Sequence, residues 1–188
     1  MTWIAQAAAQ QPVPLMGGNG PEVQTSLAQA VRVAERWTGE RARRAEMERK
    51  RTGYVYEIET VSADRWAEVL VDPASGTVLR VDAPGLVSSI TNVFDREIQR
   101  TDQAALARLE ASSMSMADAI DAAQKETGGG AVKAAVRGQH GSTLFEVRVI
   151  KDWTMRKVLV NPTTAKVVTV PPSERREGED YRKGEDYR

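Results

Sequence analysis

The sequence predicts an α+β fold of two tandem repeats, each made of one helix followed by a four-stranded antiparallel meander. Two observations predict it. Residues 26–81 align without a gap onto residues 115–170, at a constant offset of 89 positions (115 − 26). Within each repeat, apolar residues first recur at helical spacing and then alternate as in strands. The matched positions are mostly apolar, small or turn residues, so the repeat preserves a scaffold and shows no duplicated catalytic group.

The first repeat opens with a predicted helix. Thr25 or Ser26 is a suitable N-cap, and Gly39 provides the stop. The apolar residues between them recur at helical spacing: Leu27, Ala30, Val31, Ala34 and Trp37. Extended segments follow near 42–50, 53–61, 66–72 and 77–81, and residues 72–76 (Asp-Pro-Ala-Ser-Gly) are typical of a tight turn.

The second repeat shows the same order of elements. A helix is expected from about 115 to 127, with Met116, Ala119, Ile120 and Ala123 on its apolar face. Strands are expected near 131–137, 143–151, 154–160 and 166–170. The last turn has diverged, because Asn161 and Ala165 replace the aspartate and the glycine of the first repeat.

Composition shifts set the expected domain boundaries. A Gln-, Ala-, Pro- and Gly-rich stretch suggests a flexible start, and the apolar spacing of Ala105 and Leu109 suggests a helix between the repeats. The expected units are a flexible segment 1–24, repeat one 25–82, a helical linker 83–114, repeat two 115–171, and a charged tail 172–188. The tail has no apolar core residues and is expected to be disordered.

Charge and composition exclude several classes of function. The formal net charge is zero, so no overall field attracts nucleic acid or a membrane, and no apolar run approaches the about 20 residues of a transmembrane helix. There is no cysteine and a single histidine, His140, in a glycine turn. A Ser-His-Asp triad, a thiol nucleophile and a tight zinc or copper site are therefore not expected. The chain is predicted not to be an enzyme.

The beginning of the chain allows two interpretations of its compartment. Residues 5–7 (Ala-Gln-Ala) resemble the small-x-small triplet of a signal-peptidase site. A basic segment and an apolar segment before the triplet are both missing. An exported protein and a plain Ala- and Gln-rich terminus both fit this pattern.

Strand alternation predicts an open sheet face that is acidic in one repeat and basic in the other. Five carboxylates share the open face of the first repeat: Glu46, Glu48, Glu57, Glu59 and Glu68. The same positions in the second repeat are Ala135, Arg137, Glu146, Arg148 and Lys157. Two tryptophans, Trp66 and Trp153, fall in the sheet region of the two repeats.

Three explanations of these faces stay open. The five glutamates could bind a hard cation such as calcium or a lanthanide, although no Asp-x-Asp-x-Asp-Gly loop is present to support this. The faces could instead dock on a protein partner or on each other, within one chain or in a homodimer. The partner-binding residues would then be Trp66, Arg137, Arg148, Trp153 and Lys157. Finally, the charges could simply pair across strands on a solvated face.

The motifs resemble the PepSY domain family. Tyr56-Glu57-Ile58 and the segment 69–79 (Val-Leu-Val-Asp-Pro-Ala-Ser-Gly-Thr-Val-Leu) carry the resemblance in the first repeat. Phe145-Glu146-Val147 and the segment 158–162 carry it in the second. The tandem arrangement also resembles the architecture of β-lactamase inhibitor protein. The PepSY resemblance implies a non-catalytic domain outside the cytoplasm, of a kind found in protease propeptides, envelope regulators and metal-uptake systems.

These observations predict a non-enzymatic, exported binding protein in the periplasm or outside the cell. Its expected role is protein interaction, inhibition or regulation, with an envelope protein or a protease as partner and without nucleic acid or a membrane span. The alternative is a periplasmic protein that binds a hard metal ion through the acidic sheet face.

Overall fold

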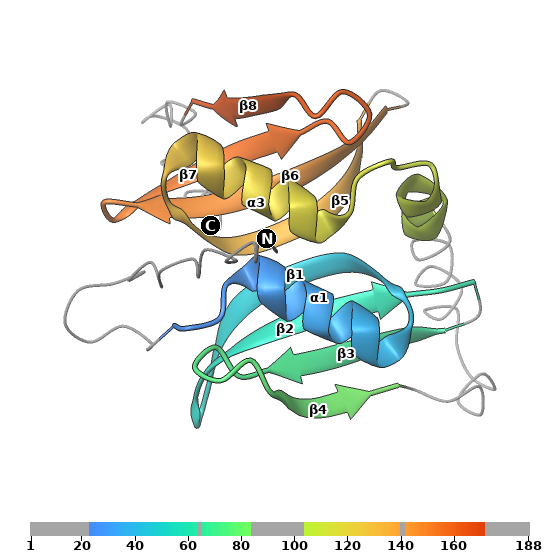
Figure 1. Cartoon of the computed structure of the whole chain (residues 1–188), viewed down its shortest axis with the longest axis vertical. Coiled ribbons are helices and arrows are strands. Elements are labelled where there is room, and N and C mark those ends of the chain that lie inside the picture. The colour runs from blue at the N-terminus through green and yellow to red at the C-terminus, as the bar shows by residue number, and fades with distance from the viewer. Residues whose placement is uncertain (1–22, 64, 84–103, 140–141, 172–188) are drawn as a thin grey trace, which may run out of the picture.

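The computed structural model describes residues 23–63, 65–83, 104–139 and 142–171. They form one eight-stranded antiparallel sheet in the order β4-β3-β2-β1-β5-β6-β7-β8. Helices α1 and α3 lie side by side against the same face of this sheet (Figure 1). The sequence did not decide whether the two repeats share a sheet, and the structure shows that they do. No helix in the described part of the chain is long and apolar enough to cross a membrane.

The first helix, α1 (Leu27–Thr38), has the ends that its sequence predicts. The Ser26 hydroxyl accepts a hydrogen bond from the Gln29 backbone N–H at 3.2 Å, and the Gln29 side chain accepts one from the Ser26 N–H at 2.7 Å. This reciprocal pair is a capping box. Gly39 ends the helix with a φ of 72°, a left-handed conformation that glycine adopts without strain.

Four strands follow α1 as an antiparallel meander, as predicted. They are β1 (Arg41–Lys50), β2 (Gly53–Val61), β3 (Trp66–Val71) and β4 (Val78–Asp82). Their alternation places Tyr56, Ile58 and Val69 under α1, where all three are fully buried. Because successive side chains of a strand point to opposite sides, the intervening glutamates lie on the face away from the helix.

The second repeat has the same architecture. It comprises α3 (Met116–Thr127), β5 (Gly130–Gln139), β6 (Ser142–Lys151), β7 (Thr154–Val160) and β8 (Val167–Val170). Its last turn keeps the conformation of the first repeat although the sequence has diverged. Ala165, which occupies the position of Gly76, has a φ of 54°, close to the 72° of that glycine.

The two repeats meet along an internal two-fold axis. At the seam between β1 and β5, Ala45 lies directly opposite Ala134, and these residues are repeat equivalents (134 − 45 = 89). Arg44 lies opposite Ala135 and Glu46 opposite Lys133 on either side of them. Equivalent residues can face each other in this way only on or beside a two-fold axis, so the axis runs through the seam, normal to the sheet.

The core fills the space between the helices and the sheet. The largest fully buried side chains are Tyr56 of β2 and its repeat equivalent Phe145 of β6. The Tyr56 hydroxyl donates a hydrogen bond to the Thr25 carbonyl oxygen at 2.9 Å. Between the repeats, residues 104–110 form a helix whose Ala105 and Leu109 are buried in the same core. Residues 84–103 of the expected linker, the segment 1–22 and the tail 172–188 lie outside the described residues.

Trp37 corrects one sequence expectation. Its spacing assigned it to the apolar face of α1, but 67% of this residue is exposed. Position 37 lies at the margin of the stripe formed by Leu27, Val31 and Ala34, because a helix advances by about 100° per residue. A large side chain at that margin projects beyond the packed face.

Candidate functional site

The candidate site is the open face, which we define as the side of the sheet opposite α1 and α3. Its outline in the first repeat matches the sequence prediction. Arg44 lies across from Glu59, Glu46 from Glu57, and Glu59 from Glu68 in the strand register. The open face therefore carries a block of carboxylates on three adjacent strands.

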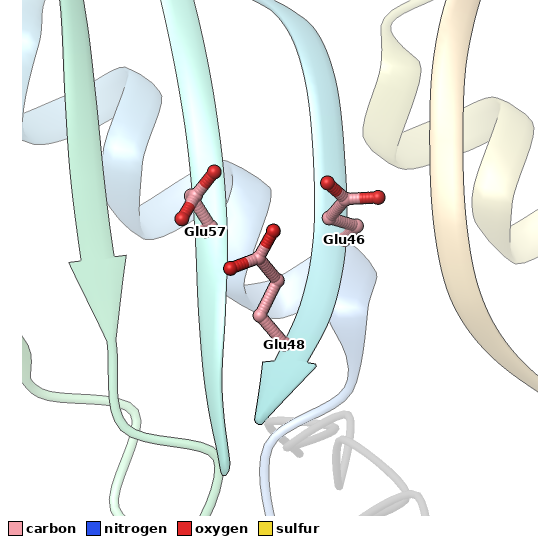
Figure 2. Close-up of side chains that lie close together, drawn as sticks. All are labelled: Glu46, Glu48 and Glu57. Carbon is pink, nitrogen blue, oxygen red and sulfur yellow. The ribbon is translucent and has the colours of Figure 1, made fainter. Parts of the chain in front are cut away.

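Three of the five predicted glutamates converge. Glu46 and Glu48 on β1 and Glu57 on β2 each direct a carboxylate toward the others (Figure 2), and one oxygen atom from each lies within 4.8 Å of the other two. Glu59 and Glu68 form a separate pair across β2 and β3. We call Glu46, Glu48 and Glu57 the glutamate cluster.

Cationic side chains already neutralise the glutamate cluster. The Lys50 ammonium donates hydrogen bonds to Glu48 and, at 2.7 Å, to Glu57. These two hydrogen bonds raise the pKa of Lys50. Arg44 and Lys133 both donate to Glu46. Three cations therefore meet three carboxylates, and a metal ion would have to displace at least one of them.

Glu46 connects the two repeats electrostatically. Its partner Lys133 belongs to β5, so this ion pair crosses the seam. Burial of the Glu46 carboxylate raises its pKa, but the hydrogen bonds from Lys133 and Arg44 outweigh this effect and hold the pKa below its ordinary value. The ionised form of Glu46 is therefore stabilised by the fold.

In the second acidic pair, Glu59 is compensated by arginine side chains and Glu68 is not compensated to the same extent. The Glu59 carboxylate accepts an ion pair from Arg43 at 2.7 Å and lies 3.7 Å from the Arg44 Nε atom. Burial raises the pKa of Glu68, and the nearby Glu57 carboxylate raises it further. The ionised form of Glu68 is thus disfavoured in the folded protein.

The second repeat presents a basic row on the same open face. Lys133, Arg148 and Lys157 lie directly opposite one another on β5, β6 and β7. Like charges that face each other across strands destabilise a sheet. One carboxylate, Glu146, lies 3.6 Å from Arg148 and 3.9 Å from Arg137, so two guanidinium groups share it. The basic half thus keeps an excess of positive charge.

The structure separates the predicted partner-binding residues into two groups. Arg137, Arg148 and Lys157 lie on the open face, and Trp66 lies half-buried at the start of β3. Trp153 instead occupies the turn between β6 and β7, where 70% of it is exposed. The aromatic side chain at that turn is therefore not part of the charged face.

Sequence reasoning missed one contributor to these surfaces. Lys50 binds two members of the glutamate cluster, and the signal was present, because Lys50 continues the alternation of Glu46 and Glu48 along β1. Met155, which strand alternation already places on the open face of the second repeat, is 53% exposed. His140 lies outside the described residues.

Comparisons with known proteins identify the family. No curated protein matches this chain. Among solved structures, the chain is similar to the crystal structure of a "putative lipoprotein" from Clostridium difficile 630, with 19% sequence identity and a TM-score of 0.42 over 86% of this chain and 100% of that chain. The family profile for the peptidase propeptide and YPEB domain, PepSY, matches twice, at residues 25–82 and 113–170. This chain belongs to the PepSY family, as a tandem pair of its domains.

Proposed function

We propose that this chain is a non-catalytic, exported binding module of the cell envelope that engages a protein partner across the open face. The family description supports the proposal, because it names a peptidase propeptide domain, which is typically an inhibitor-like module and not a catalytic one. The chain also has one histidine and no cysteine, which leaves few means for nucleophilic catalysis.

The polarity of the open face carries the proposal. Glu59 and Arg148 are repeat equivalents (148 − 59 = 89), and so are Glu68 and Lys157 (157 − 68 = 89). The internal two-fold axis places them at matching positions of the two halves. A scaffold has no need for opposite charges at equivalent positions, whereas a partner with the complementary polarity would bind in one orientation only.

The partner that fits is an envelope protein or a protease with a basic and an acidic region side by side. A second copy of this chain carries the same two regions, so a homodimer is the alternative partner. Contacts of this kind would set the orientation and the association rate more than the affinity, and they would weaken with salt.

The experiment is charge reversal on both halves. Glu59→Lys/Glu68→Lys and Arg148→Glu/Lys157→Glu should each reduce capture of the partner from an envelope extract, and sedimentation velocity of the purified chain tests the homodimer. Lys125→Glu/Lys166→Glu is the matched control, since both lysines are exposed and lie away from the open face. A captured protein whose binding survives both open-face reversals would refute the proposal.

A second candidate function is binding of a hard cation, such as calcium or a lanthanide, by the glutamate cluster. The convergence of three carboxylate oxygens within 4.8 Å favours it. The cation would replace the Lys50 ammonium between Glu48 and Glu57. The sequence also predicted Glu59 and Glu68 as ligands of this ion. They lie opposite each other on β2 and β3, apart from the glutamate cluster, and would not bind it.

Thermal melts with calcium and lanthanum test this candidate. An ion that binds only the native state stabilises it by about 2.7 kcal/mol at a hundredfold excess over Kd. Glu48→Gln/Glu57→Gln should abolish the stabilisation, and Lys50→Gln should strengthen it by removing the competing cation. An unchanged melting temperature in wild type and in Lys50→Gln would exclude the site.

A further inference from the structure

The turn between β6 and β7 holds a tryptophan in an unfavourable backbone conformation. Asp152 and Trp153 are the two residues of this turn, with φ values of 48° and 62°. Two consecutive positive φ angles define the type I′ hairpin turn, which favours Asn-Gly and Gly-Gly. A bulky residue with a positive φ is an outlier and is associated with function.

The fold does not benefit from this tryptophan. Trp153 is 70% exposed, so little of its apolar surface is buried in the core. A glycine would fit the turn better and a polar residue would suit the exposure. The side chain thus combines a backbone cost with little packing gain, which points to contact with something outside the fold.

The residues next to Trp153 extend it into an amphipathic tip. Met155 is 53% exposed, and Arg156 and Lys157 follow it, both exposed. In the register of the hairpin, Lys157 of β7 lies opposite Arg148 of β6, so the Arg148 guanidinium adds a third positive charge beside Arg156 and Lys157. We call Trp153, Met155, Arg156 and Lys157 the hairpin tip.

The first repeat has no such tip. The position of Trp153 is occupied by Asp64, that of Met155 by the half-buried Trp66, that of Arg156 by Ala67 and that of Lys157 by Glu68. Both repeats form the same hairpin scaffold without sharing these residues. The tip is therefore a property of the second repeat alone and is not required by the fold.

We infer that the hairpin tip docks on an anionic phospholipid bilayer. Tryptophan is enriched at membrane interfaces, where its ring lies at the level of the headgroups, and flanking arginine and lysine side chains bind anionic headgroups. Apolar insertion together with a basic collar is the usual combination for peripheral binding. Trp153 lies in the turn at the end of the hairpin, so its ring can insert while Met155, Arg156 and Lys157 stay paired within β7.

The zero net charge of the chain does not oppose this docking. Charges on the surface of a protein are screened over about 8 Å at physiological ionic strength, so the bilayer responds to the local charge of the tip. Apart from Glu146, which Arg137 and Arg148 neutralise, the carboxylates of the open face lie on β1, β2 and β3, on the other side of the seam. Docking through the tip leaves this acidic half free for a protein partner.

Vesicle co-sedimentation of the full chain tests the inference. Vesicles of phosphatidylcholine alone are compared with vesicles in which about a third of the lipid is phosphatidylglycerol. Wild type should partition onto the anionic vesicles and not onto the neutral ones, and added salt should release it. Trp153→Ser and Arg156→Gln/Lys157→Gln should each lower the partition coefficient at least tenfold.

Two matched controls keep the result specific. Trp37→Ser removes an equally exposed tryptophan, 67% against 70%, from the first repeat and should leave partitioning unchanged. Lys125→Gln/Lys166→Gln removes the same charge from exposed positions outside the tip and should also have no effect. Wild-type emission should shift to the blue on binding, and Trp153→Ser should lose most of this shift.

Three results would overturn the inference. They are equal partitioning onto neutral vesicles, no partitioning onto anionic ones, and equal losses in the control variants. Release of the chain from the anionic vesicles by soluble polyglutamate is a further readout. If this release were equal in wild type and in Trp153→Ser, the partner of the tip would be an acidic protein and not a bilayer. Trp153→Ser keeps the test independent of the proposed protein-binding function, because this variant retains Glu59, Glu68, Arg148 and Lys157, whereas Lys157 belongs to both surfaces.

Discussion

Arg32 of α1 and Asp121 of α3 are the same position in the two repeats (121 − 32 = 89), and they bind each other at 2.7 Å. The Arg32 guanidinium also reaches Asp118 at 2.9 Å. The hydrogen bond that Arg32 donates to Asp121 is the main reason that the pKa of Arg32 is raised. The internal two-fold axis thus passes between the helices as well as through the strand seam, and opposite charges meet on it.

This geometry predicts that the pair can be reversed. Arg32→Asp should lower the free energy of unfolding, because three aspartates would then face one another between the helices. The loss should be near 1 kcal/mol, since both side chains are more than a third exposed. Arg32→Asp/Asp121→Arg should recover most of it in urea denaturation. If the double variant lost as much unfolding free energy as the two single variants together, this result would contradict the two-fold relationship.

The two equivalent turns give a second prediction. Ala165 has a φ of 54°, so Ala165→Gly should relieve backbone strain and stabilise the fold by about 0.5–1 kcal/mol. Gly76→Ala should destabilise it, because φ is 72° and the added Cβ atom would lie 2.9 Å from the Thr25 hydroxyl oxygen. Equilibrium denaturation measures both changes. Effects of the same sign would show that the two turns are not equivalent.

The basic row predicts a stabilising substitution. Lys157 faces Arg148 directly across β6 and β7, so Lys157→Glu replaces a repulsive pair with an attractive one. The expected gain is about 0.2–1 kcal/mol and should decrease with salt. Lys166→Glu changes the net charge equally at an exposed turn position and is the control. An equal gain in the control would assign the effect to net charge.

Glu46 and Glu68 should affect the pH dependence of stability in opposite directions. The pKa of Glu46 is lowered in the folded state, so the unfolded chain binds its proton more tightly. The stabilisation that follows is present above the ordinary glutamate pKa of about 4.3 and is lost as the pH falls through the lower folded value. Glu46→Gln should therefore destabilise the protein at pH 7 and have little effect at pH 3.

The pKa of Glu68 is raised by burial and by Glu57, so its ionisation disfavours the folded state. This penalty appears as the pH rises above about 4.3. Glu68→Gln should accordingly stabilise the protein at pH 7 and be neutral at pH 3. Unfolding free energies of the two variants and of wild type at both pH values check the pair of predictions. The same direction of change for both variants at pH 7 would contradict them.

Replacement of Trp153 should raise the stability of the fold and lower binding to anionic vesicles. Trp153→Gly places the favoured residue at a φ of 62° and should stabilise the fold by about 1 kcal/mol. The same substitution should abolish partitioning onto anionic vesicles. Denaturation and co-sedimentation of one preparation measure both effects. A variant that lost stability together with binding would show that Trp153 supports the fold.

Local patterns were sufficient to predict the repeat unit. The capping residue Ser26, the stop at Gly39 and the alternation through Tyr56 and Ile58 each depend on neighbours in the sequence. The open-face positions of Glu46, Glu57 and Glu68 follow from the same alternation and were confirmed. Arrangement within a strand is set by the two-residue period, which the sequence displays directly.

The seam and the ion pairs could not be predicted in the same way. The β1–β5 ladder registers only three residue pairs, centred on Ala45 and Ala134, and no alternation distinguishes these residues from other edge residues. The pairing of Lys133 with Glu46 depends on that seam and was therefore hidden. Helical spacing places Trp37 at the margin of the apolar stripe of α1, but it does not give how far the packed core extends toward that margin.

The axis through Ala45 and Ala134 has a consequence for how this face can change over time. In a dimer of identical chains every substitution occurs twice, and a residue beside the axis meets its own copy, so Arg32 would face arginine. Fusion of the two halves into one chain removes that restriction, because a single codon change alters one half and leaves the other intact. An acidic half and a basic half, and an aromatic turn in one repeat only, are arrangements that become accessible to evolution after such a duplication.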